Sequence, residues 1–223
     1  VESRPPAIEF RPHVVRNPSG LFVMWYEDRP EAIVSSGYSV ATSESPLGPF
    51  HTVASNVFVA DVPGDFDLLV DDDGACYHVQ TTTNDPNATK GFVVTTLNDK
   101  CTAVATPKRV ARFEAPMPAE GPVFFKGPPG TGYYILGGTT CCACVGGSSI
   151  YVFRAPHPLG PWRYVGDIGS TGSPFDPHSP SNYVTRAQAS AVFTVGQEYV
   201  WLGNQWGNPG KHWNADLLFW STL

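Results

Sequence analysis

Residues 13–26, His-Val-Val-Arg-Asn-Pro-Ser-Gly-Leu-Phe-Val-Met-Trp-Tyr, decide the fold of this chain. They join a short apolar strand to an aromatic-rich strand through a turn that contains a glycine. The same pattern returns three times, and its turn glycines Gly20, Gly74, Gly130 and Gly196 follow one another at intervals of 54, 56 and 66 residues. A period of this length is typical of a repeated β-sheet unit. The sequence therefore predicts an all-β fold, a β-propeller with four visible blade-like repeats.

A third strand is expected after each hairpin, at residues 38–41, 91–94, 150–153 and 217–220. Two of these strands are followed by nearly the same residues, Ser-Pro-Leu-Gly-Pro-Phe at 45–50 and His-Pro-Leu-Gly-Pro-Trp at 157–162. Prolines are tolerated at the outer edge of a sheet, so each stretch predicts a fourth, outer strand after it. We expect residues 1–223 to form one propeller domain, whose ring is incomplete and is completed by a further part of a longer chain or by a neighbouring chain.

The composition excludes several classes of partner. The 223 residues carry a formal net charge of −6, and the 14 lysines and arginines are scattered, which removes the basic surface that nucleic-acid binding needs. Apolar runs are strand-sized and far shorter than the roughly 18 residues of a membrane span. The sequence contains no motif for a nucleotide, a redox cofactor or a Ser-His-Asp centre, so we expect no cofactor.

Five cysteines are present, Cys76, Cys101, Cys141, Cys142 and Cys144. We interpret them as disulfide candidates in a secreted protein, with at least one left over because the count is odd. A metal site at 141–144 is the alternative, but a second ligand pair at a suitable spacing is missing. Asn87, in the triplet 87–89, is a candidate glycosylation site. The acidic run 71–74 is more typical of a hairpin tip than of a calcium loop, and we expect no metal.

Four equivalent positions lie 8 to 10 residues before the turn glycines, just ahead of the first strand of each unit. They hold Phe10, Asp65, Glu120 and Gln188. Equivalent positions in successive blades surround one axis, so the repeat predicts that these side chains converge. Glycosidic bond cleavage requires an acid and a second group that activates water or tunes the acid, and Glu120 and Asp65 are the candidates. Asp67 competes with Asp65 for its role.

Aromatic side chains supply candidate sugar-stacking surfaces. Most aromatics of a propeller pack between blades, so core positions are the better interpretation for any single ring. Trp206 and Trp213, flanked by polar residues and glycine, are the expected exceptions. Together with Tyr183 they are candidate substrate-binding residues.

These stretches together resemble glycoside hydrolase family 43, five-bladed propeller enzymes, and within it the exo-β-1,3-galactanase branch. The resemblance rests on residues 11–17, on Asp65 with 69–74, on Glu120-Gly121-Pro122 with 124–126, on 158–162 and on 186–188. It implies that Glu120 is the general acid, that Asp65 orients it and modulates its pKa, and that Gln188 lies near the attacking water. It also implies inversion at the anomeric carbon and a substrate of the β-galactan or arabinogalactan type.

Two departures from the family leave a second interpretation open. Phe10 stands where the family has a glutamate, and Glu9 could replace that sugar contact only if the strand bulges at its start. Four repeats are visible where the family has five. The alternative is therefore a catalytically inactive propeller module that binds glycan or builds an extracellular assembly.

Overall fold

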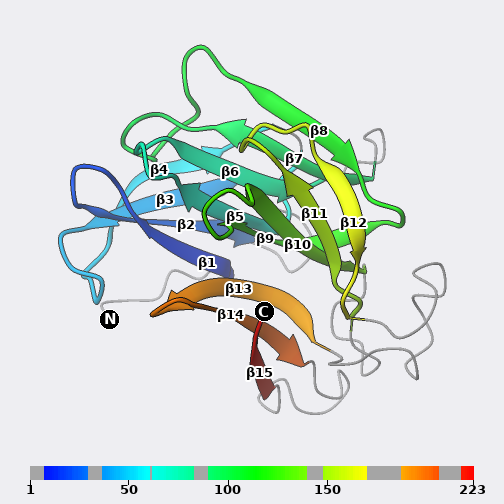
Figure 1. The fold of residues 1–223 in the computed structure, drawn as a ribbon. Helices are drawn as coiled ribbons and strands as arrows, with labels where there is room; N and C mark the ends of the chain where they lie inside the picture. Colours follow the sequence, from blue (N-terminus) through cyan, green and yellow to red (C-terminus); the bar gives the residue numbers. More distant parts are fainter. Residues whose placement is uncertain are drawn as a thin grey trace. The chain divides into compact units, whose positions relative to one another are not determined.

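The computed structural model describes residues 8–29, 37–60, 62–82, 90–139, 148–169, 187–205 and 217–223. In these ranges fifteen strands form four sheets and no helix occurs, so the all-β prediction is confirmed (Figure 1). A helical membrane span is accordingly not found in this part of the chain.

Each sheet takes its strands in chain order. The first consists of β1 (Ile8–Arg16), β2 (Phe22–Arg29), β3 (Tyr38–Ser43) and β4 (His51–Val57). The second consists of β5 (Phe66–Val70), β6 (Cys76–Thr81), β7 (Gly91–Thr96) and β8 (Val110–Glu114). The third consists of β9 (Ala119–Lys126), β10 (Tyr133–Thr139), β11 (Tyr151–Ala155) and β12 (Arg163–Asp167). The fourth has β13 (Gln188–Val195), β14 (Glu198–Gln205) and β15 (Leu217–Thr222).

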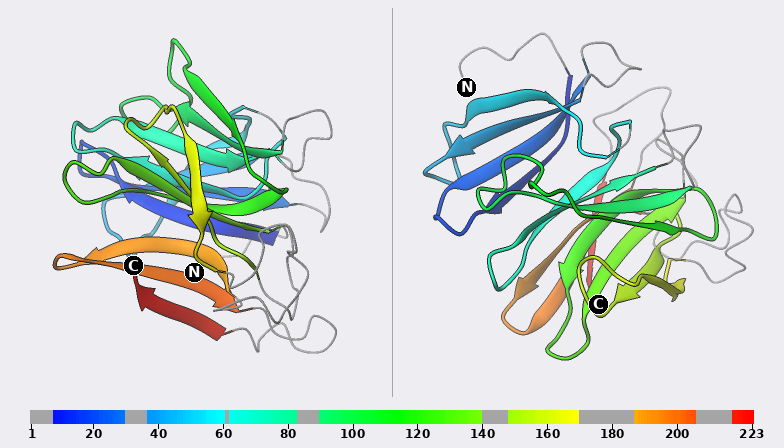
Figure 2. Two further views of the ribbon diagram at one scale, coloured as in Figure 1. Left: turned by 45° about the vertical axis from the view of Figure 1, so that its right-hand side comes forward. Right: turned by 90° about the horizontal axis from the view of Figure 1, so that it is seen from above.

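These sheets are the four predicted blades of a β-propeller. In the left view of Figure 2, β13 and β14 (orange) lie side by side and β15 (red) follows them at the edge of their sheet. The described residues form no fifth blade. The single-domain interpretation stays a prediction.

The four hairpins form as predicted because each turn glycine adopts a left-handed backbone. Gly20, Gly74, Gly130 and Gly196 have φ values of 92°, 84°, 82° and 64°, a region that glycine enters without the steric cost of a Cβ. The acidic run 71–74 is a hairpin tip, in which Gly74 N donates to Asp71 O at 2.9 Å.

The two proline-rich stretches also form matching turns. The peptide bonds before Pro49 and Pro161 are both cis, and β4 and β12 follow them as the predicted outer strands. The fourth strand of the second sheet, β8, follows a third cis proline, Pro107, but no Pro-Leu-Gly-Pro stretch, and it was not predicted from the sequence.

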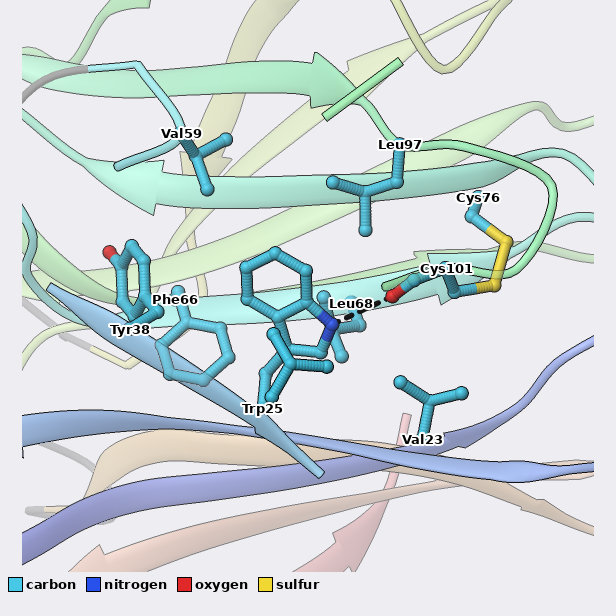
Figure 3. Packing of buried hydrophobic residues seen from close by; sticks show 10 residues of the cluster. Val23, Trp25, Tyr38, Val59, Phe66, Leu68, Cys76, Leu97 and Cys101 are labelled. Atoms are coloured by element: carbon cyan, nitrogen blue, oxygen red, sulfur yellow. Dashed lines mark hydrogen bonds between the residues drawn. A yellow bond between two sulfur atoms is a disulfide. The ribbon is translucent and has the colours of Figure 1, made fainter. Parts of the chain in front are cut away.

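The chain divides into two compact units. Unit 1 comprises Val1–Ala88 and Val93–Arg112, and unit 2 comprises Thr89–Phe92 and Phe113–Leu223. The core of unit 1 is built around Trp25, Tyr38 and Phe66, which are fully buried (Figure 3). The indole N–H of Trp25 donates to the carbonyl of Cys101 at 2.7 Å, beside the disulfide between Cys76 and Cys101.

This disulfide confirms two of the five candidate cysteines. Cys141, Cys142 and Cys144 lie outside the described residues, and so does Asn87. Unit 2 has its own core, made of small and large apolar side chains from β9, β10, β13 and β14 together with the residues that precede β11 and β13. Its members are Val123, Leu136, Ile150, Ala187, Ala189 and Trp201.

Candidate active site

In unit 2, two of the predicted site residues touch. The side-chain amide Nε2–H of Gln188, the first residue of β13, donates to Oε1 of Glu120, the second residue of β9, at 3.0 Å. Gln188 is buried, with 3% of its surface exposed, whereas Glu120 is half-buried. The two residues are 68 positions apart in sequence, so the fold brings together a carboxyl group and an amide that the repeat had placed at equivalent positions.

A β-bulge gives the Glu120 side chain its direction. Between Glu120 and Val123, two residues of β9, Gly121 and Pro122, lie opposite the single residue Gly137 of β10. Gly121 has a φ of 63°, the left-handed conformation that such bulges place on glycine. Bulges bend a strand and change the direction of a side chain, and they are over-represented next to active sites.

The neighbouring strand leaves no space for larger residues behind this bulge. A Cβ atom at Gly138, the cross-strand partner of Glu120, would collide with Oγ of Ser148. A Cβ atom at Gly137 would collide with the ring of Phe92. The backbone of β10 is therefore packed tightly where it supports the carboxyl group.

In unit 1, the two acidic candidates each pair with a basic residue of β1. Oδ2 of Asp65 lies 2.8 Å from Nη1 of Arg11, and both side chains are largely buried, with 12% and 13% exposed. Oδ1 of Asp67 lies 2.9 Å from Nδ1 of His13 and also accepts a hydrogen bond from the backbone N–H of Leu68 at 2.7 Å. Asp67 is thus fixed by its own strand and by His13, and Asp65 by Arg11.

The backbone around Asp65 is held by a buried tyrosine. The Tyr38 hydroxyl donates to the carbonyl of Gly64 at 2.8 Å and accepts from the N–H of Gly64 at 3.0 Å. Burial raises the pKa of Tyr38 well above its ordinary value, so the hydroxyl remains a neutral donor. The carbonyl of Asp65 accepts from the N–H of Thr81 at 2.9 Å. Asp65 therefore has defined contacts on both its backbone and its side chain.

Behind these pairs lies a buried histidine. The His78 ring stacks on Phe66, with centroids 5.2 Å apart, and Phe66 contacts His13 edge-on at 5.1 Å. Burial, with a smaller contribution from the charge of His13, lowers the pKa of His78 to about 3. No hydrogen-bond partner of either His78 ring nitrogen is found among the described residues. His78 is thus a neutral member of the aromatic core.

The first strand contains the same kind of bulge as β9. Between Phe10 and His13, the residues Arg11 and Pro12 lie opposite Tyr26 alone, and Arg11 has a φ of 48°. The irregularity therefore comes after Phe10, whereas a bulge ahead of it was needed for Glu9 to take its place. The backbone of Glu9 pairs with Asp28, and the side chains of Glu9 and Phe10 lie outside the described part of the structure.

The other predicted binding residues, Tyr183, Trp206 and Trp213, lie outside the described ranges. Among the four equivalent positions, only Asp65 precedes its strand, since Phe10, Glu120 and Gln188 lie within theirs. The sequence-based prediction missed Arg11 and His13 as partners of the acids. The sequence does contain a signal for these pairs, because the basic residues at positions 11 and 13 have the same two-residue spacing as the acids at positions 65 and 67.

No family model matches the sequence, and no match was found among curated proteins. Solved structures, however, share its fold. The exo-β-1,3-galactanase of Phanerochaete chrysosporium, with galactose, has a TM-score of 0.75 and 19% identity, and the match covers 97% of this chain and 46% of that one. The exo-β-1,3-galactanase of Clostridium thermocellum has a TM-score of 0.76 and 19% identity, with coverage of 97% and 46%.

A third structure, a family GH43 β-1,3-galactosidase with galactodeoxynojirimycin, has a TM-score of 0.76 and 17% identity, with coverage of 100% of this chain and 74% of that one. This chain spans less than half the length of the two galactanase chains. The expected resemblance is supported at the level of the fold, which these enzymes share with the chain.

Proposed function

We propose that this chain is a glycoside hydrolase that acts on a β-linked galactan, of the β-1,3-galactan or arabinogalactan type, with Glu120 as its general acid. The observation that carries the proposal is the 3.0 Å contact between Glu120 and Gln188. The fold supports it, because the chain resembles galactanase structures along 97% of its length.

The amide of Gln188 suits a carboxyl group that must alternate between two protonation states. An amide has both a donor and an acceptor, so it can donate to the carboxylate and, with its oxygen turned inward, accept from the carboxylic acid. In the proposed reaction, Glu120 gives its proton to the glycosidic oxygen while the bond to the anomeric carbon breaks. Gln188 is then a positioning residue for the acid.

The proposed stereochemistry is inversion. A retaining glycosidase needs a carboxylate, or another nucleophile, that forms a covalent glycosyl intermediate. An amide such as Gln188 is a poor nucleophile and a poor base. In the inverting reaction a water molecule attacks the anomeric carbon directly and its proton leaves to solvent. An NMR spectrum of the first product formed should therefore show the anomer opposite to the substrate linkage.

The experiment that tests the acid is sugar release from β-1,3-galactan, arabinogalactan, arabinan and xylan, followed by chromatography. Sugar should be released from galactan, and Glu120→Gln should lower the rate of release about 10²- to 10⁴-fold. Glu198→Gln is the matched control, because Glu198 is an exposed glutamate at the far end of β13 and β14. Equal activity of Glu120→Gln and the unsubstituted protein would overturn the assignment.

Asp65 is the proposed partner that orients and tunes Glu120. Its ion pair with Arg11 supports this, because a guanidinium group holds a carboxylate in a defined direction. A double-mutant cycle between Asp65→Asn and Glu120→Gln should be strongly non-additive. Asp67→Asn with Glu120→Gln is the control cycle, since Asp67 binds His13 and its own strand. Additive losses in the first cycle would refute the partnership.

A second candidate function is a glycan-binding module without activity. The observation that favours it is the β1 bulge, which repeats the β9 bulge but carries Phe10 in the place of Glu120. In affinity electrophoresis, β-1,3-galactan in the gel would slow the migration of such a module. The module would release no sugar from any glycan. Release of sugar would exclude it.

We also propose that the protein is extracellular. The disulfide between Cys76 and Cys101 supports this, because such bonds persist in oxidising compartments. Mass spectrometry of the protein from its native source should find the cross-linked peptide, together with a glycan on Asn87. A fully reduced cysteine pair in that material would contradict the proposal.

A further inference from the structure

A cavity of about 750 Å³ lies at one end of the third sheet, entirely within unit 2. Its walls come from the end of β9, the start of β10, the end of β11 and the start of β12. Its volume lies within the roughly 300–1,000 Å³ range of small-molecule sites. Lys126 and Glu120 lie at opposite ends of β9, and at about 3.3 Å per residue their Cα atoms are about 20 Å apart. The cavity is thus separate from the candidate active site.

The walls of this cavity are positively charged, although the whole chain has a net charge of −6. Lys126, Arg154 and Arg163 line it, and none of the lining residues is an aspartate or glutamate. Arg154 and Arg163 are direct cross-strand partners on β11 and β12. Like charges placed opposite each other destabilise a sheet. Two arginines at these positions are therefore an arrangement that folding by itself does not favour.

The cations are oriented by their neighbours. Nε of Arg154 donates to the carbonyl of Thr131 at 2.7 Å, which uses one of the five N–H donors of the guanidinium. The Lys126 ammonium lies over the Tyr133 ring, 5.2 Å from its centroid. The Arg163 side chain is exposed, and within the described residues it has no ion-pair partner. The cavity is therefore lined by two cations that are oriented by their neighbours, Lys126 and Arg154, and by the guanidinium group of Arg163.

Tyrosine side chains complete the walls. Tyr164 lines the cavity with 38% of its surface exposed. Burial, and to a lesser degree the charge of Asp167, raises the pKa of Tyr164, so its hydroxyl is a neutral donor. Aromatic rings beside hydrogen-bond donors suit the apolar face and the hydroxyl groups of a sugar ring.

We propose that this cavity is a second binding site, and that it takes a carboxylate-bearing sugar, a uronic acid unit of an acidic polysaccharide. The planar guanidinium groups match the two oxygens of a carboxylate, and the tyrosines match the sugar ring. The site lies outside the proposed hydrolytic centre and does not depend on the activity of that centre.

Affinity electrophoresis in native gels tests the proposal, with polygalacturonate in one gel and the same polymer after reduction of its carboxyl groups in a second. Each mobility is expressed relative to the mobility of the same protein in a gel without polymer, because the variants change the protein's charge. Arg163→Gln and Arg154→Gln should each weaken retardation by polygalacturonate about tenfold or more. Arg109→Gln, which removes an exposed arginine from unit 1, is the control with the same change of charge.

The proposal holds if polygalacturonate retards the protein, its reduced form does not, and the loss is confined to the two cavity variants. Equal loss in Arg109→Gln would show unspecific attraction and overturn it. Equal retardation by the reduced polymer would show a site for neutral sugar, and equal retardation by dextran sulfate would show a general anion site. Either result also overturns it. Arg163→Gln should not lower the urea unfolding midpoint, because it removes a repulsion between β11 and β12.

Discussion

The first strands of two sheets, β1 in unit 1 and β9 in unit 2, contain the same kind of β-bulge, but the side chains around it differ. In both, two residues bulge opposite one, the first has a positive φ and the second is proline. In β9 the left-handed residue is Gly121 and the residue before it is Glu120. In β1 these positions hold Arg11 and Phe10. The same bulge thus follows different residue types, and of these two positions only the one in β9 carries a carboxyl group.

The largest effect on activity is expected when the acid, Glu120, is replaced. Glu120→Gln should lower hydrolysis about 10²- to 10⁴-fold, because a positioned general acid contributes about this much. Phe10→Glu in that background should not restore it, since β9 is the strand that contacts Gln188. Steady-state rates on β-1,3-galactan measure both. Recovery in the double variant would show that the two bulges are interchangeable.

The pH dependence of stability extends the comparison, because among the described residues the buried neutral histidine, His78, belongs to unit 1. The folded pKa of His78 is about 3 and the ordinary value is 6.5, so between these pH values the unfolded chain binds a proton that the folded chain does not. Stability is then lost as the pH falls below 6.5, by up to about 1.4 kcal/mol per pH unit, and the loss ends near pH 3.

Urea unfolding at pH 7, 5.5 and 4.5 measures this loss. His78→Phe should flatten it, because the phenyl ring keeps the stacking on Phe66 and takes up no proton. His51→Phe, at an exposed histidine of the same unit, should leave it unchanged. Parallel pH profiles for the unsubstituted protein and His78→Phe would contradict the role of burial.

Two substitutions of Arg11 measure backbone strain and the effect of the ion pair on activity separately. A Cβ atom in the left-handed region costs about 1–2 kcal/mol, so Arg11→Gly should be about 1 kcal/mol more stable than Arg11→Ala. Both variants lose the ion pair with Asp65, and both should lose activity by up to about 100-fold through misplacement of that carboxylate. Urea unfolding and rate measurements give the two quantities. Full activity in Arg11→Gly would mean that the ion pair has no catalytic role.

The last test concerns Gly121, the corresponding position of β9. Gly121→Ala places a Cβ at a φ of 63° and should destabilise the protein by about 1–2 kcal/mol. The matched change Gly196→Ala, at the tip of the β13–β14 hairpin, has a similar φ of 64° and open space around the new Cβ. Similar loss of stability with loss of activity only in Gly121→Ala would show that the β9 bulge serves the site.

The strands could be predicted from the sequence because they depend on local signals. The apolar alternation and the turn glycines act within about ten residues, and they located β1, β2 and the equivalent strands in all four sheets. These signals miss β8, which has exposed and half-buried residues in alternation and follows Pro107 rather than a Pro-Leu-Gly-Pro sequence.

The candidate site was predicted in part, because its residues follow the repeat while its contacts depend on bulges. The register placed Glu120 and Gln188 at equivalent positions, but their contact is a property of the folded strands. The pairing of Arg11 with Asp65 links residues 54 positions apart and depends on a non-glycine residue in a left-handed conformation, which no propensity favours. The cationic cavity was missed because Arg154 and Arg163 become neighbours only through strand pairing.

Because its indole N–H is hydrogen-bonded to Cys101, Trp25 can serve as an intrinsic fluorescence probe of unit 1. The indole is fully buried, and its N–H is bound to the backbone of a disulfide-bonded cysteine. Reduction of that disulfide releases a constraint next to the acceptor carbonyl, and water that reaches the indole shifts its fluorescence to longer wavelength. The emission of Trp25, isolated as the difference from Trp25→Phe, should therefore report the redox state of the Cys76–Cys101 pair in solution without any added dye.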